Sequence, residues 1–368
     1  MADMFRFADD LGPKKIIHIT DPKVGLRAIL VVDNVAAGPA IGGCRMAPDV
    51  SVDECFRLAR AMTFKNAAAG LAHGGGKSVI FGDPAMPAAA KEAVIRAFAR
   101  AVGDVTDYIT GPDMGTNEIA MAWVTDEIGR SVGLPREIGG IPLDEIGATG
   151  FGVAVAAEVA EGYSEVRLDG ARVAVQGFGA VGRHAARYLA KRGAILVAAS
   201  DSRGTIADPA GLDLAALDAV KAAGRGVAEL GVGAAGARDA VIDVECDIWI
   251  PAARPDVITA ANVDRLNTRL VLEGANIPIT ADAEARLHDK GVLVVPDFIA
   301  NAGGVISAAV EYHGGTESGA LTVIDEKLRR NTDAVLGLAR QDAIPPRQAA
   351  VRIARDRVVA AMALRRHA

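Results

Sequence analysis

Two lysines and one aspartate in the first third of the chain carry side chains that can take part in proton transfer. Lys65 lies near the end of a predicted helix, Lys77 follows three consecutive glycines, and Asp113 lies in a loop after a predicted strand. One lysine can fix a carboxylate, and another can act as general base toward water if burial or a nearby cation lowers its pKa. Water attack on a 2-imino acid, as in oxidative deamination, would use such a set. Taken alone, each residue also fits a structural role, such as a solvated lysine or an aspartate in a turn.

A glycine-rich motif in the middle of the chain predicts a dinucleotide site. The motif follows the predicted strand 172–176, opens a predicted helix, and consists of Gly177, Phe178, Gly179, Ala180, Val181 and Gly182. Its glycines permit a tight turn, the approach of a pyrophosphate, and close packing of the helix on the strand. The N-terminus of that helix attracts the phosphate charge.

An acidic residue at the end of the next predicted strand bears on the choice of cofactor. Asp201 can accept a hydrogen bond from a ribose 2′-hydroxyl and repels a 2′-phosphate, which favours NAD over NADP. Ser202 and Arg203 follow directly, and an arginine at this place can accommodate a 2′-phosphate. We therefore expect NAD as the cofactor and keep NADP as the alternative.

Alternating strands and helices must position these residues. In the N-terminal part the pattern predicts strands at 16–20, 27–33, 78–81 and 108–110 and helices at 51–69, 88–102 and 117–128. After a break at 139–142, helices at 151–161 and 182–192 alternate with strands at 172–176, 195–200, 247–250, 270–273 and 292–295. The last 50 residues read as helices. This alternation predicts an α/β protein with a doubly wound sheet.

The composition excludes several classes of protein. The 368 residues carry a formal charge of −6 without clustered lysine and arginine, which argues against a nucleic-acid partner. No apolar run of about 18 residues and no signal peptide pattern is present, so we expect a cytoplasmic protein with no membrane span. The three cysteines are widely spaced, and His73 has no second clustered histidine, so we expect neither a disulfide framework nor a metal site.

Five stretches of the sequence resemble the glutamate/leucine/phenylalanine/valine dehydrogenase family, and together they span most of the chain. They are residues 38–46, residues 62–67 with 74–78, residues 111–116, residues 147–150 with the glycine motif, and residues 296–305. The resemblance implies an N-terminal α/β catalytic and oligomerisation domain at 1–140 and a Rossmann domain at 141–310. It also implies C-terminal helices at 311–368 that return to the first domain, and a homo-oligomeric assembly.

The resemblance also implies roles for individual residues. Lys65 resembles the lysine that binds the substrate α-carboxylate, Lys77 the lysine that activates water, and Asp113 the aspartate that transfers protons. Other residues near the substrate would be Ile41, Gly42, Gly43, Met62, Gly111, Asn301 and Ala308. The cofactor residues would be the glycine motif with Thr149, Asp201, Ser202, Ala252, Asn276 and Asn301.

Two of these positions bear on the amino-acid substrate. Glutamate enzymes of the family place a lysine where this chain has Ile41 and a serine where it has Ala308. An ionised side-chain carboxylate would then be left unpaired in an apolar pocket, at a cost of several kcal/mol. We therefore expect an apolar L-amino acid, branched-chain in preference, with ammonia and a 2-oxo acid as products. Phenylalanine or glutamate dehydrogenase activity, a 2-hydroxy-acid dehydrogenase and a non-catalytic NAD-binding regulatory protein remain alternatives.

Overall fold

The computed structural model describes residues 5–365, which divide into two compact units. The first unit contains the chain up to Leu143, Val305–Ala320, and the residues from Val351 onward. The second unit contains Asp144–Gly304 and Leu321–Ala350. This division differs from the expected ranges in the C-terminal part, because residues 305–310 pack within the first unit and residues 321–350 within the second. Residues 1–4 and 366–368 of the expected ranges lie outside the described residues.

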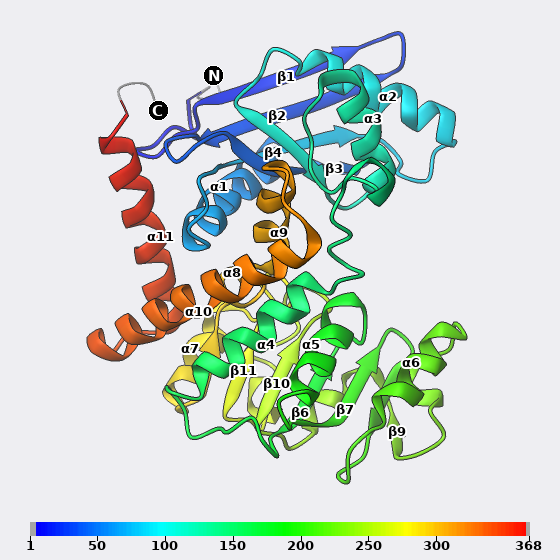
Figure 1. Cartoon of the computed structure of the whole chain (residues 1–368), viewed down its shortest axis with the longest axis vertical. Coiled ribbons are helices and arrows are strands. Elements are labelled where there is room, and N and C mark those ends of the chain that lie inside the picture. Colours follow the sequence, from blue (N-terminus) through cyan, green and yellow to red (C-terminus); the bar gives the residue numbers. More distant parts are fainter. Residues whose placement is uncertain (1–4, 366–368) are drawn as a thin grey trace. The chain divides into compact units, whose positions relative to one another are not determined.

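A five-stranded mixed sheet forms the centre of the first unit (Figure 1). Its strands are β1 (Lys15–Asp21), β2 (Leu26–Asn34), β3 (Ala40–Ala47), β4 (Gly74–Phe81) and β5 (Tyr108–Pro112). They lie in the order β1-β2-β4-β3-β5, with β1, β2 and β4 antiparallel and β3 parallel to both β4 and β5. The predicted strands are present, and β3 is an additional strand that the sequence pattern did not reveal.

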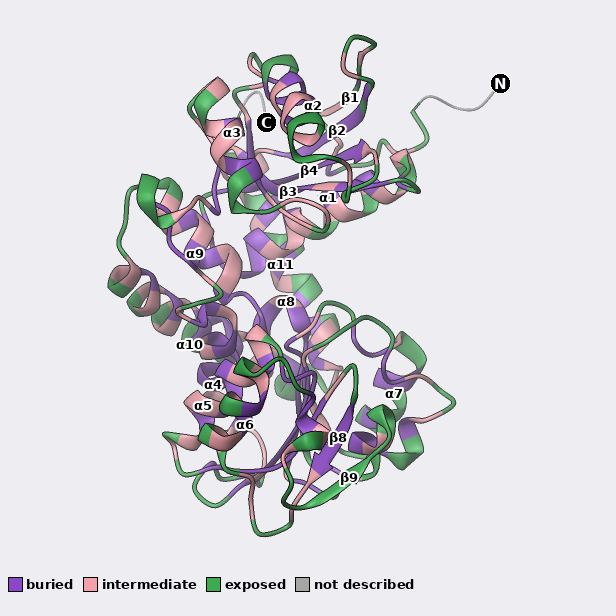
Figure 2. Cartoon of the chain, turned by 90° about the vertical axis from the view of Figure 1, so that its right-hand side faces the viewer, coloured by how far each residue is buried: buried purple, intermediate pink, exposed green. Residues whose placement is uncertain are grey.

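Helices cover both faces of this sheet. Helix α1 (Val52–Ala68) packs on one face, and α2 (Ala88–Ala101) and α3 (Glu118–Ile128) pack on the other. Alternation along β2 explains the two layers, because Leu30 packs with Phe98 of α2 whereas Val31 packs with Cys55 of α1. The residues of both sets are buried, and the ribbon of this sheet is largely coloured as buried in Figure 2. Ser51 caps α1 by accepting a hydrogen bond from the Glu54 amide at 3.1 Å, as the sequence predicts.

The three glycines before Lys77 lie inside β4, which corrects the prediction that the strand begins at residue 78. A strand tolerates them here because neighbouring backbone approaches too closely for side chains. A Cβ at Gly75 would lie 2.0 Å from the Thr63 amide nitrogen of α1, and a Cβ at Gly42 would lie 1.7 Å from the Gly76 carbonyl oxygen. Lys77 is therefore held by a strand rather than by a flexible loop.

A seven-stranded sheet forms the centre of the second unit. Its strands are β6 (Arg172–Gln176), β7 (Ile195–Asp201), β8 (Gly204–Ala207), β9 (Ala234–Gly236), β10 (Ile248–Pro251), β11 (Leu270–Leu272) and β12 (Leu293–Val295). Their order is β12-β11-β10-β6-β7-β8-β9, and the strands from β12 to β7 are parallel. This is the predicted doubly wound arrangement. The antiparallel strands β8 and β9 were not predicted.

Helices complete both units. They are α4 (Ala148–Ala160), α5 (Ala180–Ala190), α6 (Leu214–Ala222), α7 (Ala281–Asp289), α8 (Asp297–Ala300), α9 (Gly303–Tyr312), α10 (Glu317–Asp342) and α11 (Pro346–Ala363). Short 3₁₀ helices lie at Arg136–Ile138, Val227–Glu229, Arg238–Asp243 and Val263–Arg265. Helix α4 begins three residues before the predicted start at 151. No helix within residues 5–365 is long and apolar enough to cross a membrane.

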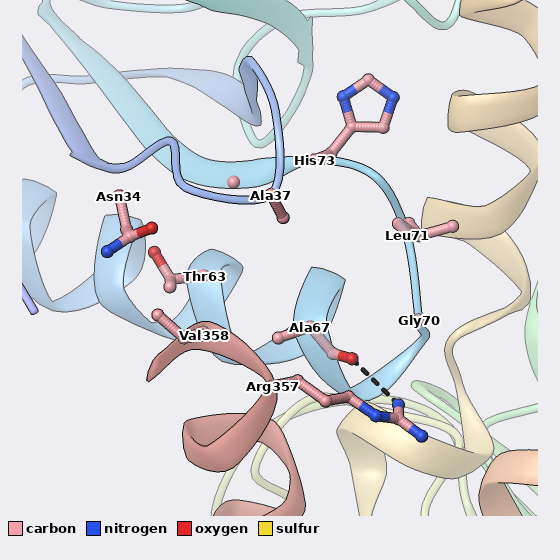
Figure 3. Close-up of a pocket in the computed structure, with 10 residues that line it drawn as sticks. Asn34, Ala37, Thr63, Ala67, Gly70, Leu71, His73, Arg357 and Val358 are labelled. Atoms are coloured by element: carbon pink, nitrogen blue, oxygen red, sulfur yellow. Dashed lines mark hydrogen bonds between the residues drawn. The ribbon is translucent and has the colours of Figure 1, made fainter. Parts of the chain in front are cut away.

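The last helix returns to the first unit, as expected. Arg357 of α11 donates a hydrogen bond to the Ala67 carbonyl oxygen at 3.0 Å (Figure 3) and another to the Ala68 carbonyl oxygen at 2.7 Å. These carbonyls lie in the last turn of α1, where no later turn of the helix supplies an amide donor. The Ala67 carbonyl oxygen also accepts a hydrogen bond from the Gly70 amide at 2.9 Å. A cavity of about 230 Å³ lies beside this contact, lined by residues that include Asn34, Thr63 and Val358.

The first turn of α11 belongs to the second unit and carries one arginine among three carboxylates. Arg347 contacts Glu273, Glu284 and Asp297 at 2.5, 2.5 and 2.9 Å. The other oxygen of Asp297 accepts a hydrogen bond from the Ile277 amide at 2.9 Å. Glu273 is fully buried, and within residues 5–365 its Oε1 atom has no hydrogen-bond partner.

Candidate active site

The parallel strands of the first sheet align several predicted site residues in rows. Ile41 of β3 lies opposite Gly75 of β4 and Ile109 of β5, and Gly43 lies opposite Gly111. Paired residues of neighbouring strands point to the same face, and alternate residues along a strand share that face. Lys77 therefore extends from the face that α1 covers, since the position of Gly75 faces Thr63 of α1.

Lys77 and Asp113 meet on this face. The Lys77 ammonium donates to Oδ2 of Asp113 in a close ion pair, and the Lys77 side chain is almost fully buried. Asp113 directly follows β5, in the predicted loop. A Cβ at Gly43 would lie 2.8 Å from the Cβ of Asp113, so only glycine leaves room for this carboxylate.

A third charged residue, for which the sequence pattern predicted no role, completes the cluster. Arg45 of β3 lies 3.5 Å from Oδ1 of Asp113 and 2.5 Å from Glu54 of α1. The Met114 amide also donates to Oδ1 of Asp113, at 2.6 Å. A sequence signal for Arg45 does exist, because it stands two residues after Gly43 and thus on the same face of the strand.

These contacts determine the ionisation of Asp113. Burial raises the pKa of its carboxyl group, but the charge and hydrogen bond of Lys77, the Met114 amide and Arg45 together lower this pKa below its ordinary value. The carboxylate is therefore ionised at neutral pH and in direct contact with an ammonium group. This contact joins Nζ of Lys77, a proton donor, directly to a carboxylate oxygen that can accept a proton.

The remaining predicted substrate residues have varied positions. Lys65 and Met62 lie partly buried in the last turns of α1, the helix that covers the face of Lys77. Asn66 ties this end of α1 to the sheet, with its amide nitrogen 2.7 Å from the Gly74 carbonyl oxygen. Ile41, Gly42 and Gly111 are buried in the strands, and Ala308 is partly buried in α9.

His73 has a histidine neighbour, which corrects the expectation from the sequence. Its Nε2 atom lies 3.1 Å from Nε2 of His313, and its Nδ1 atom lies 3.0 Å from the Pro39 carbonyl oxygen. Burial lowers the pKa of His73. Within residues 5–365 no group of three or more histidine, cysteine or acidic side chains could hold a metal ion.

The glycine motif lies at the point where the strand order of the second sheet reverses. Strand β6 has β7 on one side and β10 on the other, and ligands bind at such a switch point, beyond the carboxyl ends of the strands. Gly177 has a φ of +97°, and its Cα faces the backbone of Ala252 after β10. A Cβ at Gly182 would lie 2.1 Å from the Gly177 carbonyl oxygen, so α5 packs directly on the turn. Phe178 is buried beneath it.

Three features of this unit fit a nicotinamide dinucleotide. A Cβ at Gly179 would have no atom of residues 5–365 within 4 Å, so packing within the protein does not require a glycine at this position. The close approach of a pyrophosphate to the backbone would require one. Ala180 and Val181 open helix α5, whose first amides lack partners within the helix. In addition, no group in residues 5–365 bonds to the buried side-chain oxygen of Asn301.

The residues expected around the nicotinamide lie close together. The Asn301 amide nitrogen donates to the Asn276 side chain at 3.0 Å and to the Ala275 carbonyl oxygen at 3.3 Å. Thr149, in the first turn of α4, faces Gly304 at the start of α9, where a Cβ would lie 3.2 Å from its hydroxyl. The structure thus gathers Thr149, Asn276 and Asn301 around the segment between α8 and α9.

Asp201 lies at the end of β7, as expected, but its carboxylate already has several partners. Oδ2 accepts from the Lys221 ammonium at 2.7 Å and from the Val227 amide at 3.0 Å, and Oδ1 accepts from the Arg203 amide at 2.9 Å. Burial raises the pKa of Asp201, but these hydrogen bonds bring it below its ordinary value. Ser202 and Arg203 form the exposed turn between β7 and β8.

Comparison with known proteins agrees with this arrangement. Residues 139–366 match the family described as Glutamate/Leucine/Phenylalanine/Valine dehydrogenase, and residues 13–130 match its dimerisation domain. A glutamate dehydrogenase of Aeropyrum pernix is 39% identical over 90% of this chain and 85% of its own length. A leucine dehydrogenase of Geobacillus stearothermophilus is 32% identical over 97% of this chain and 93% of its own.

A solved structure has the same fold over nearly the whole chain. The hetero-hexameric glutamate dehydrogenase of Thermus thermophilus in a leucine-bound form superposes with a TM-score of 0.84 and 29% identity, covering 96% of this chain and 90% of that one. The protein is therefore a member of the glutamate/leucine/phenylalanine/valine dehydrogenase family, whose enzymes are nicotinamide-dependent oxidoreductases that act on the CH–NH2 group of amino acids.

Proposed function

We propose that the protein catalyses the NAD-dependent, reversible oxidative deamination of an apolar L-amino acid, branched-chain in preference, to a 2-oxo acid and ammonia. The observation that carries the proposal is the buried pair of Lys77 and Asp113 on a sheet face that it shares with Ile41 and Gly111. A bound nicotinamide supplies the acceptor for the hydride from the substrate Cα.

The chain's own groups would then act on the substrate and on water. Lys65 fixes the α-carboxylate, Lys77 takes a proton from the water that attacks the 2-imino acid, and Asp113 receives and returns protons through its contact with Lys77. Lys77 and the Met114 amide, with a smaller contribution from Arg45, keep Asp113 ionised between turnovers. Thr149, Asn276 and Asn301 hold the nicotinamide end of the cofactor.

The preference for an apolar substrate depends on Ile41 and Ala308. Ile41 is almost fully buried between Gly75 and Ile109 and offers no charge to a distal carboxylate. Gly111 and Ala308 are small and offer neither a charge nor a polar side chain to the substrate. A glutamate substrate remains the second candidate, because relatives with that activity match the chain as well as a leucine dehydrogenase does.

We also propose that the protein works as a homo-oligomer. The match of residues 13–130 to a dimerisation domain supports this proposal, and we expect the contact to involve the first unit. Sedimentation of the purified chain tests it, and a monomer at assay concentrations would contradict it.

The substrate assignment is tested by NADH consumption with ammonia and a panel of 2-oxo acids: 4-methyl-2-oxopentanoate, 3-methyl-2-oxobutanoate, phenylpyruvate and 2-oxoglutarate. We expect ammonia-dependent turnover of the branched-chain acids and none of 2-oxoglutarate. The double variant Ile41→Lys, Ala308→Ser should gain 2-oxoglutarate and lose the branched-chain acids. Turnover of 2-oxoglutarate alone by the unaltered protein would overturn the pocket argument, and no ammonia-dependent turnover at all would leave a non-catalytic NAD-binding protein.

A further inference from the structure

The corner at the end of β7 contains more positive charge than the sequence around Asp201 suggests. Lys221, the next to last residue of α6, places its ammonium 2.7 Å from Asp201, whose side chain is 8% exposed. Arg203, in the turn after β7, donates to the Gly224 carbonyl oxygen at 2.6 Å and lies 3.9 Å from Glu229. The negative charges of Asp201 and Glu229 are therefore matched by the positive charges of two bases, Lys221 and Arg203.

The hydrogen bonds of Asp201 leave little of its acceptor capacity unused. An ionised carboxylate has about four acceptor positions, two on each oxygen. Lys221 and the Val227 amide use both positions on Oδ2, and the Arg203 amide uses one on Oδ1. One position remains for a ribose 2′-hydroxyl, so the usual advantage of an acidic residue for NAD is reduced.

We propose that Lys221 is a specificity-determining residue of the ribose subsite, which neutralises Asp201 and so lets the protein bind NADP as well as NAD. The inference rests on the proposed use of NAD and extends it. A 2′-phosphate that approaches Asp201 meets an ion pair rather than an isolated negative charge, so its repulsion is weaker. Arg203, with an exposed side chain, can then contact the phosphate.

The test compares dissociation constants of NADH and NADPH, measured by the change in nicotinamide fluorescence on binding. The Lys221→Met variant frees Oδ2 for the ribose hydroxyl and leaves the charge of Asp201 without its lysine partner. We expect the ratio of the NADPH constant to the NADH constant to rise by about tenfold, the change that 1.4 kcal/mol produces. The Asp201→Asn variant, which keeps Lys221, should lower this ratio.

Matched controls separate a local charge effect from a structural one. Lys290→Met removes another lysine–aspartate pair of the same unit, at 2.5 Å from Asp264, and should leave the ratio unchanged. Lys221→Gln keeps a hydrogen-bond donor without the charge and should reproduce most of the effect of Lys221→Met. Calorimetric titration with 2′,5′-ADP and 5′-ADP should give the same change in ratio, because these fragments contain only the adenosine half.

The outcomes distinguish the inference from the proposed function. If both Lys221 variants bind NADH and NADPH with a ratio within twofold of the unaltered protein, Lys221 does not set specificity and the inference is wrong. An equal weakening of both cofactors would likewise assign Lys221 a structural role only. Failure of the unaltered protein to bind either dinucleotide would instead overturn the proposed function itself.

Discussion

The buried carboxyl group of Glu273 leads to a pH-dependent prediction for stability. Burial raises the pKa of Glu273 from 4.5 to about 8, because the nearby charge of Arg347 offsets the loss of solvation only in part. Between these values the folded protein holds a proton that the unfolded chain releases. The stabilisation that this group provides is therefore complete below about pH 4.5 and is lost as the pH rises toward 8.

The size of the effect follows from the shift. Each pKa unit corresponds to about 1.4 kcal/mol, so a shift from 4.5 to about 8 amounts to roughly 5 kcal/mol of unfolding free energy lost across the interval. Glu273→Gln removes this titration. The unfolding free energy of the variant, relative to that of the unaltered protein, should therefore rise by about 1.4 kcal/mol for each pH unit between these limits. Its amide, which lacks a partner at the position of Oε1, adds a pH-independent cost of about 1–3 kcal/mol.

Denaturant unfolding followed by circular dichroism from about pH 5 to about pH 9 measures this difference. Glu245→Gln, at an exposed position of the same unit, serves as the control and should show a constant difference from the unaltered protein. If the stability curves of Glu273→Gln and the unaltered protein run parallel across the range, Glu273 titrates near its ordinary value and the reasoning fails.

Three further predictions concern the candidate site. Lys77→Ala should reduce kcat by at least about 10²-fold while the NADH dissociation constant changes little, and equal loss of both would argue against a purely catalytic role. Arg45→Met removes a cation that lowers the pKa of Asp113, so the acidic limb of the pH profile of kcat should move to higher pH. The control Arg57→Met, at an exposed position, should leave this limb in place. An unmoved limb in Arg45→Met would refute the effect of Arg45 on Asp113. Gly179→Ala should keep its melting temperature but bind NADH at least about tenfold more weakly, whereas Gly182→Ala should have a lower melting temperature. NADH titration and thermal melting measure these effects, and normal NADH affinity in Gly179→Ala would exclude the pyrophosphate from this turn.

The sequence predicted those parts of the fold and site in which local pattern and tertiary structure agree. The G-x-G-x-x-G motif, the strand before it and the capping residue Ser51 are local signals, and each lies where expected. Strand β3 was not predicted because Gly42 and Gly43 weaken its hydrophobic pattern. Glycine is required at these positions only because segments distant in sequence pack closely against them. Lys221 could not be identified at all, since the turn after β7 and the length of α6 bring it to Asp201. Likewise, His313 meets His73 only through the return of α9 to the first unit.

The cap that Arg357 places on α1 also has a consequence for biosynthesis. The first unit draws on Val305–Ala320 and on the residues from Val351, so the ribosome has made every strand of the second unit before the first can be completed. Until then the carbonyl oxygens of Ala67 and Ala68 lack the Arg357 donor, and part of the apolar core of the first unit stays exposed in the nascent chain. The second unit, nearly continuous in sequence, can fold earlier. Premature termination just before α11 would therefore spare every strand of the second unit and leave the first unit, which contains Lys77, open to proteolysis and aggregation.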